Sequence, residues 1–201
     1  MEAELRFGGN AYPTEMCEFP FRLMGQGFFP GGDGLWREHG ALGASTDGDL
    51  PRGGVVFVGN DFGTISSFRK LQKKSYENVP TWRHLKIRVE RAGIPKDKTF
   101  FTNAVVGLRK DGLALEKVNR AELPAFAEFC AEFLSFQLDV LSPQLVVVMG
   151  PQARSAFENF HNRTNGYDVL FMRHPYGDFG LSGELKDRET QELAAAWNKL
   201  S

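Results

Sequence analysis

The sequence has few cysteines and no long apolar run. Cys17 and Cys130 are the two cysteines among 201 residues and form no CxxC pair, which argues against a disulfide framework and favours a reducing compartment. No window of about 18 apolar residues suggests a membrane span. The opening segment, MEAELRFGGN, is unlike a secretory signal. We therefore expect a cytoplasmic protein without a membrane partner.

An excess of basic charge is also lacking. The chain has 24 Lys and Arg against 25 Asp and Glu, a formal net charge of -1, so no overall positive field attracts nucleic acid. Contact with nucleic acid would need a local patch, and FRKLQKK, with Arg69, Lys70, Lys73 and Lys74, is a candidate. Such clusters are also common on solvated helix faces. No GxGxxG or GxxxxGK[ST] loop supports an unrelated enzyme of phosphorylated metabolites.

Four short apolar runs follow a loop-rich segment at residues 1–52. They are Val55–Val58, Thr99–Val106, Leu145–Met149 and Val169–Met172, and each is typical of a strand buried on both faces. Helical patterns separate them, which predicts a parallel sheet covered on both sides. We expect one domain over residues 1–201, monomeric, with an α/β fold: a three-layer α/β/α sandwich with a central four-stranded parallel sheet.

The helices are predicted from apolar residues at helical spacing. They are expected in TWRHLKIRVERAG (81–93), from near Pro124 to Ser142, from Pro151 onward, and in KDRETQELAAAWNKL (186–200). Thr81 is a plausible N-cap of the first helix and Gly93 its stop. The second carries an aromatic stripe that is more typical of core packing than of a surface that stacks bases; its members are Phe126, Phe129, Phe133 and Phe136, with Val140 on the same face.

Polar side chains follow or end these strands. Asn60 and Asp61 come after the first, Asn103 lies in the second, and His174 follows the fourth. Parallel strands bring their carboxyl ends to one edge, where α/β proteins bind ligands, so we expect these residues to converge. Asp61 could equally cap a turn, Asn103 could bond to loop backbone, and a lone histidine is often structural.

The segments GNDFG, FFTNAVV, LSPQLVVVMGPQARSAF and RHPYGD, in this order between Val55 and Asp178, resemble the uracil-DNA glycosylase superfamily. Cys130 falls where the iron-sulfur branch of that superfamily has a cluster ligand. A cluster held by thiolates needs four cysteines and this chain has two, so we expect no cluster and no cofactor.

The resemblance implies a role for each residue at the strand ends. Asp61 would position the attacking water, Asn103 would read the flipped base, and His174 would donate a hydrogen bond to the base as negative charge develops. Further base contacts would come from Asn60, Phe62 and Phe68. A wedge residue, Phe179 or Leu181, would fill the gap left in DNA, and Arg69, Lys70, Lys73 and Lys74 would hold phosphates.

Two hypotheses about function follow from the resemblance. The first is a DNA glycosylase that removes uracil or a related damaged base from DNA. The second is a superfamily member with altered chemistry that binds a nucleic acid, nucleotide or protein. Phe62 favours the second hypothesis, because it stands where the family usually has proline.

Overall fold

The computed structural model describes residues 16–17, 51–67, 80–112, 123–160, 166–175 and 182–200. Its strands are β1 (Met16–Cys17), β2 (Val55–Gly59), β3 (Thr99–Asn103), β4 (Leu108–Arg109), β5 (Leu145–Met149) and β6 (Asp168–Met172). Its helices are α4 (Pro80–Arg91), α5 (Leu123–Leu141), α6 (Pro151–Phe160) and α7 (Gly183–Asn198), with a short 3-10 helix at Lys96–Lys98. The prediction of one domain over residues 1–201 stays a prediction, and its loop-rich segment at residues 1–52 lies mostly outside the described residues.

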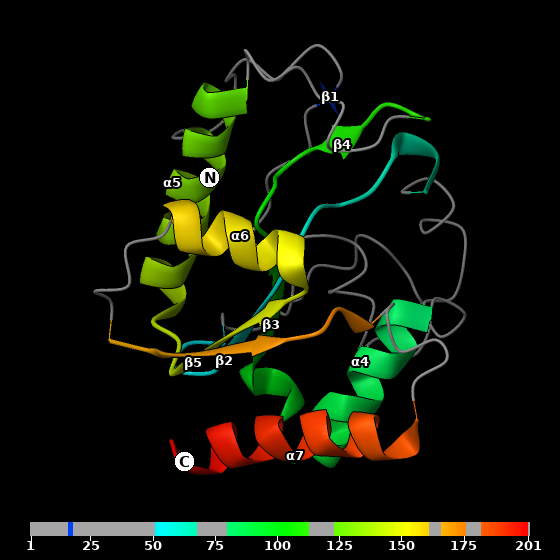
Figure 1. Cartoon of the computed structure of the whole chain (residues 1–201). Helices are drawn as coiled ribbons and strands as arrows, with labels where there is room; N and C mark the ends of the chain where they lie inside the picture. Colours follow the sequence, from blue (N-terminus) through cyan, green and yellow to red (C-terminus); the bar gives the residue numbers. More distant parts are fainter. Residues whose placement is uncertain are drawn as a thin grey trace.

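A four-stranded sheet of order β3-β2-β5-β6 forms the middle layer. All three strand pairs in it are parallel. Helices α5 and α6 cover one face, and α4 and α7 cover the other (Figure 1). The predicted three-layer α/β/α sandwich with a four-stranded parallel sheet is therefore confirmed.

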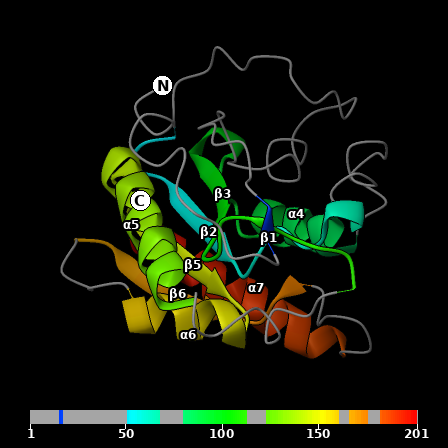
Figure 2. The same ribbon diagram turned by 90° about the horizontal axis from the view of Figure 1, so that it is seen from above.

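The order of the strands defines where a ligand site is expected. From β2 the chain moves outward to β3, and later strands lie on the other side of β2, as β5 and then β6. Seen from above, β2 and β5 lie together in the middle of the sheet (Figure 2). The strand order thus reverses between β2 and β5, and ligands of open α/β sheets bind beyond the carboxyl ends at such a point.

The second apolar run is a shorter strand than its sequence predicts. Its strand β3 ends at Asn103, whereas the apolar run continues to Val106. The backbone N–H groups of Ala104 and Val105 donate to the carbonyls of Gly59 and Asn60, so these two residues run alongside the start of the loop after β2. The chain then enters β4, which pairs antiparallel with β1. Helices α4 and α7 also begin earlier than predicted, at Pro80 and Gly183.

Two hydrophobic clusters, one on each face, hold the layers together. One includes Phe100, Phe133 and Phe157, and the other includes Phe57, Phe101 and Trp82. The aromatic stripe of α5 lies in the first cluster, as buried or partly buried packing, which supports its interpretation as core. Burying each such side chain stabilises the fold by about 1.5–3 kcal/mol. Among the described helices none is long and apolar enough to cross a membrane.

Candidate active site at the carboxyl edge of the sheet

The ends of β2 and β3 lie side by side. Gly59 is the register partner of Asn103, and the pairing continues beyond the strands, because Val105 N donates to the carbonyl of Asn60 at 2.9 Å. Asn60 and Asp61 therefore follow β2 directly beside the end of β3. Asn60 is partly exposed.

Both carboxylate oxygens of Asp61 accept hydrogen bonds. Oδ1 accepts from the backbone N of Gly63 at 3.0 Å, and Oδ2 accepts from Arg109 Nε at 2.8 Å. The first bond closes a turn in which Gly63 has a φ of 77°, a left-handed conformation that suits glycine. Asp61 thus caps a turn, as one reading of the sequence expected. Each carboxylate oxygen has two lone pairs, so Asp61 can still accept a hydrogen bond from a water molecule.

A short segment at residues 109–111 holds the loop after β2. Arg109 N donates to the carbonyl of Gly63 at 3.0 Å, Arg109 also forms an isolated parallel bridge with Thr64, and Asp111 Oδ1 accepts from Ser66 N at 2.8 Å. The sequence reasoning missed Arg109. Its only signal is a charged side chain three positions after the apolar run Thr99–Val106, and nothing local indicates a partner so far away in the chain.

The side chain of Asn103 is buried at the end of β3. The residue is 4 % exposed, and its Nδ2 is buried without a hydrogen-bond partner among the described residues. Its Oδ1 lies over Gly59, where a side chain would overlap it. A buried, unsatisfied amide donor costs about 1–3 kcal/mol. Among the described residues, no loop backbone group accepts a hydrogen bond from Nδ2.

Helix α5 supports the end of β3 through uncharged contacts. Thr102 Oγ1 donates to Gln137 Oε1 at 2.8 Å, and Gln137 Nε2 donates to the carbonyl of Phe133. Val106 N donates to Cys130 Sγ at 3.4 Å. These bonds attach the residues on both sides of Asn103 to α5.

The described residues do not fit an iron-sulfur cluster. Burial raises the pKa of the Cys130 thiol to about 12, partly offset by the Val106 N–H, so this side chain is a neutral thiol near neutral pH. The two cysteines of the chain cannot supply the four thiolates that such a cluster needs. Within the described part of the chain, no group of three or more His, Cys, Asp or Glu side chains is arranged to hold a metal ion.

His174 lies at the same edge, beyond β6. Gly150 follows β5 with a φ of 90°, and its N donates to the carbonyl of Met172 at 2.8 Å. A Cβ added to Gly150 would lie 3.1 Å from the Cβ of His174, so the glycine makes room for the histidine. His174 is partly exposed. Topology thus brings it to the edge that holds Asp61 and Asn103, on the other side of the reversal point.

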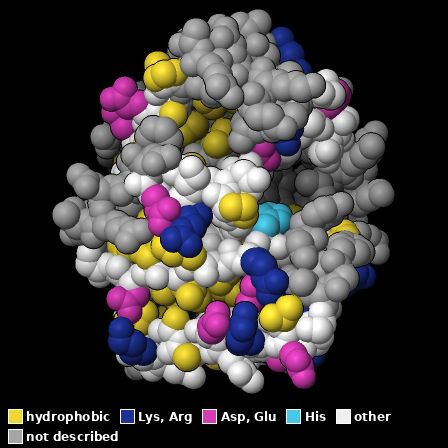
Figure 3. Space-filling view, viewed as in Figure 1, with side chains coloured by type: hydrophobic (Ala, Val, Ile, Leu, Met, Phe, Trp, Pro, Cys, Tyr) yellow, Lys and Arg dark blue, Asp and Glu magenta, His cyan; other side chains and the backbone are white. Residues whose placement is uncertain are grey.

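The other predicted contacts divide into two groups. Phe62 is 7 % exposed and packs in the core cluster on the α5 face, which favours a packing role over base stacking. The remaining predicted residues lie outside the described residues: Phe68, Arg69, Lys70, Lys73, Lys74, Phe179 and Leu181. Among the described side chains, acidic and basic groups are mixed over the lower part of the face in Figure 3.

Comparison with known proteins places the chain in a family. A family model described as the Uracil DNA glycosylase superfamily matches residues 48–201, which include every element of the four-stranded sheet. No curated protein matches the sequence.

Proposed function

The chain belongs to the uracil-DNA glycosylase superfamily, and from this premise we propose that it is a DNA glycosylase. In this proposal it hydrolyses the N-glycosidic bond of uracil or a related damaged base in DNA. The observation that carries the proposal is the buried Nδ2 of Asn103, which has no partner among the described residues. A flipped base offers an acceptor oxygen to that donor and an N–H to the neighbouring Oδ1.

Two further residues have roles in the proposed reaction. The C1′–N bond breaks with its electron pair on the base, and the oxygen of a water molecule bonds to C1′ and releases a proton to solvent. Asp61 orients that water and stabilises the cation-like sugar by its negative charge. His174 donates a hydrogen bond to the base oxygen as it becomes anionic, an interaction worth about 3 kcal/mol in comparable oxyanion sites.

Base release is the test of this proposal. Single- and double-stranded oligonucleotides with one uracil or one other deaminated base are incubated with stoichiometric protein, and alkali then cleaves at abasic sites. We expect strand breaks at the modified base with wild-type protein and a strong loss with Asp61→Asn or His174→Ala. Removing one oxyanion donor costs about 10²- to 10³-fold in comparable sites. No break on any substrate would refute the proposal.

A second candidate function is supported by the contacts of Asp61. Its oxygens already accept from Gly63 N and Arg109 Nε, which is also what a purely structural carboxylate would do. In that case the chain is a binding module that recognises nucleic acid, nucleotide or protein without releasing a base. It predicts DNA binding that weakens with salt, no strand breaks, and no change in binding with Asp61→Asn.

A further inference from the structure

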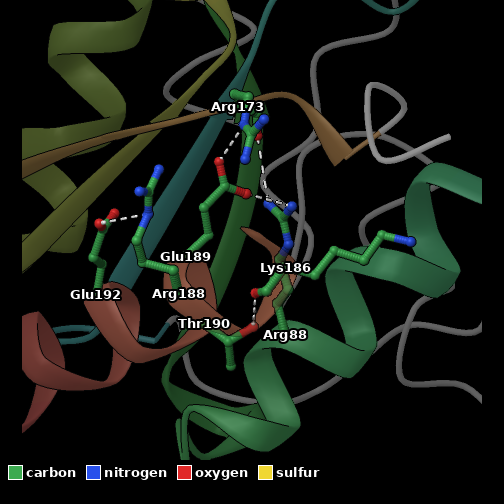
Figure 4. Close-up of polar contacts among 7 residues, drawn as sticks. All are labelled: Arg88, Arg173, Lys186, Arg188, Glu189, Thr190 and Glu192. Atoms are coloured by element: carbon green, nitrogen blue, oxygen red, sulfur yellow. Dashed lines mark hydrogen bonds and ion pairs between the residues drawn. The ribbon is translucent and has the colours of Figure 1, made fainter. Parts of the chain in front are cut away.

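The segment that carries His174 is attached to both helices on one face of the sheet. Arg173 Nε donates to Glu189 Oε1 at 2.6 Å, and Arg88 Nη2 lies 2.6 Å from Glu189 Oε2. Figure 4 shows Arg88 from α4 and Arg173 from the segment after β6 both directed at Glu189 of α7. These three residues are called the arginine–glutamate cluster below.

The cluster holds both the side chain and the backbone of Arg173. In addition to the ion pair with Glu189, the carbonyl of Arg173 lies 3.5 Å from Arg88 Nη1, which donates to it. His174 is the next residue along the chain. The backbone that sets the direction of the His174 side chain is therefore fixed by groups from α4 and α7.

Burial makes this cluster costly as a device for stability alone. The side chains of Arg88 and Glu189 are 4 % and 7 % exposed, whereas that of Arg173 is 41 % exposed. Removing charges from water carries a large penalty, and apolar replacements of buried ion clusters are often at least as stable. Holding the backbone next to His174 in place explains the cluster better than a contribution to stability does.

His174 is confined from its other side as well. Gly150 N donates to the carbonyl of Met172, and a Cβ added to Gly150 would lie 3.1 Å from the His174 Cβ, a tight contact. The backbone on both sides of Arg173 is thus held, by β5 and by the cluster. Donors that stabilise a transition state must be held in place, and a misplacement of about 1 Å can cost about 100-fold in rate.

We propose that Glu189 is a positioning residue for His174, acting through Arg173. The carboxylate holds the guanidinium of Arg173, which fixes the backbone from which His174 projects toward the carboxyl edge of the sheet. The kinetic consequence of this inference depends on the proposed glycosylase function. The structural consequence, a change at the His174 imidazole, does not.

The test uses two variants of the cluster and one matched control. Glu189→Gln removes the charge that holds Arg173. Arg173→Met is the milder variant, because it leaves the buried Arg88–Glu189 pair intact and so preserves folding. The control is Arg91→Met, which breaks the 3.2 Å pair between Arg91 and Asp187 on the same two helices, where both side chains are at least 60 % exposed.

Two readouts separate positioning from stability. The imidazole NMR signals of the chain's four histidines are recorded well below the unfolding temperature, and His174→Gln assigns the signal of His174. Single-turnover base release and KM are measured on a uracil oligonucleotide with the same proteins.

We expect Arg173→Met and Glu189→Gln to shift the His174 signal and to lower the single-turnover rate about 10- to 100-fold, with little change in KM. Arg91→Met should change neither. An unchanged His174 signal in Arg173→Met, or a loss confined to KM, would overturn the inference, even if Glu189→Gln fails to fold. If wild-type protein releases no base but the His174 signal still shifts, positioning is upheld and the proposed function fails.

Discussion

The two faces of the sheet are stabilised by different kinds of contact. On the α5 and α6 face, Phe133 and Phe157 are fully buried and the polar contact of Thr102 with Gln137 is uncharged. On the α4 and α7 face, buried charges of Arg88 and Glu189 lie in the same layer as apolar residues such as Trp82.

This difference matters because each face supports another part of the candidate site. The end of β3, with Asn103, rests on neutral bonds to α5, whereas the end of β6, before His174, rests on charges from α4 and α7. We therefore expect the stability of the two faces to respond differently to cavities, charge removal, pH and salt. The following predictions are ordered by the expected change in the free energy of unfolding.

Phe133→Ala should have the largest effect. The side chain is fully buried on the neutral face, and its removal costs apolar contact and leaves a cavity, together about 3–5 kcal/mol. Urea unfolding measures the change, with Ile87→Ala as the control because Ile87 is 42 % exposed. Equal losses in the two variants would contradict the assignment of Phe133 to the core.

Glu189→Gln should cost about 3 kcal/mol, because it removes the charge of the buried carboxylate that lies 2.6 Å from the buried Arg88 guanidinium. On the charged face, the combined replacement Arg88→Met, Glu189→Leu and Arg173→Met should restore most of this stability, because the three charges of the cluster are removed together. Urea unfolding of both proteins checks the prediction. If Glu189→Gln were as stable as wild type, the stability of this face would not depend on its charges.

The neutral face should respond to alkaline pH through Cys130. The folded thiol has a pKa raised to about 12 from an ordinary value of 9.0, so above pH 9 the unfolded chain loses a proton that the folded chain keeps. Stability is then full below pH 9 and falls by about 1 kcal/mol between pH 9 and 10. Unfolding at both pH values should show this slope in wild type, and most of it should be lost in Cys130→Ala. Tyr167→Phe removes a second group, whose pKa is raised to about 12; if it alone abolished the slope, Cys130 would not be the cause.

Asp187→Asn should have the smallest effect. The Arg91–Asp187 pair joins the helices of the charged face but is exposed on both sides, so its loss should cost less than about 0.5 kcal/mol. That loss should disappear in 1 M NaCl, where the screening length is about 3 Å. Thermal unfolding at low and high salt measures it. A loss of stability as large as that of Glu189→Gln would contradict the expectation that the exposed pair contributes less than the buried pair.

Much of the sheet could be predicted from the sequence, because uninterrupted apolar runs are typical of parallel strands covered on both faces. The run from Thr99 to Val106 was predicted too long, since apolar character does not show that Ala104 and Val105 follow the loop after β2. The antiparallel pair of β1 with β4 lacks a local signal, because each strand contributes only two residues.

The site could be predicted only where its residues stand at strand ends. Asn103 and His174 were proposed as site residues in this way. The partners of neighbouring residues lie far off in the chain, as Arg109 does from Asp61 and Glu189 from Arg173. A signal for Glu189 exists in the sequence. It stands four positions before Leu193, on the apolar face of α7, and a charged residue on such a face needs a buried partner.

The central claim, that the amide of Asn103 reads a flipped base, is tested most directly by single-turnover base release with Asn103→Ala and Thr102→Val. Thr102 is the neighbouring buried residue with a satisfied hydrogen bond, so its variant measures the cost of perturbing the same strand. The account predicts rapid release by wild type and by Thr102→Val, and loss of about 1–3 kcal/mol of transition-state stabilisation in Asn103→Ala. Equal rates for Asn103→Ala and Thr102→Val would contradict it.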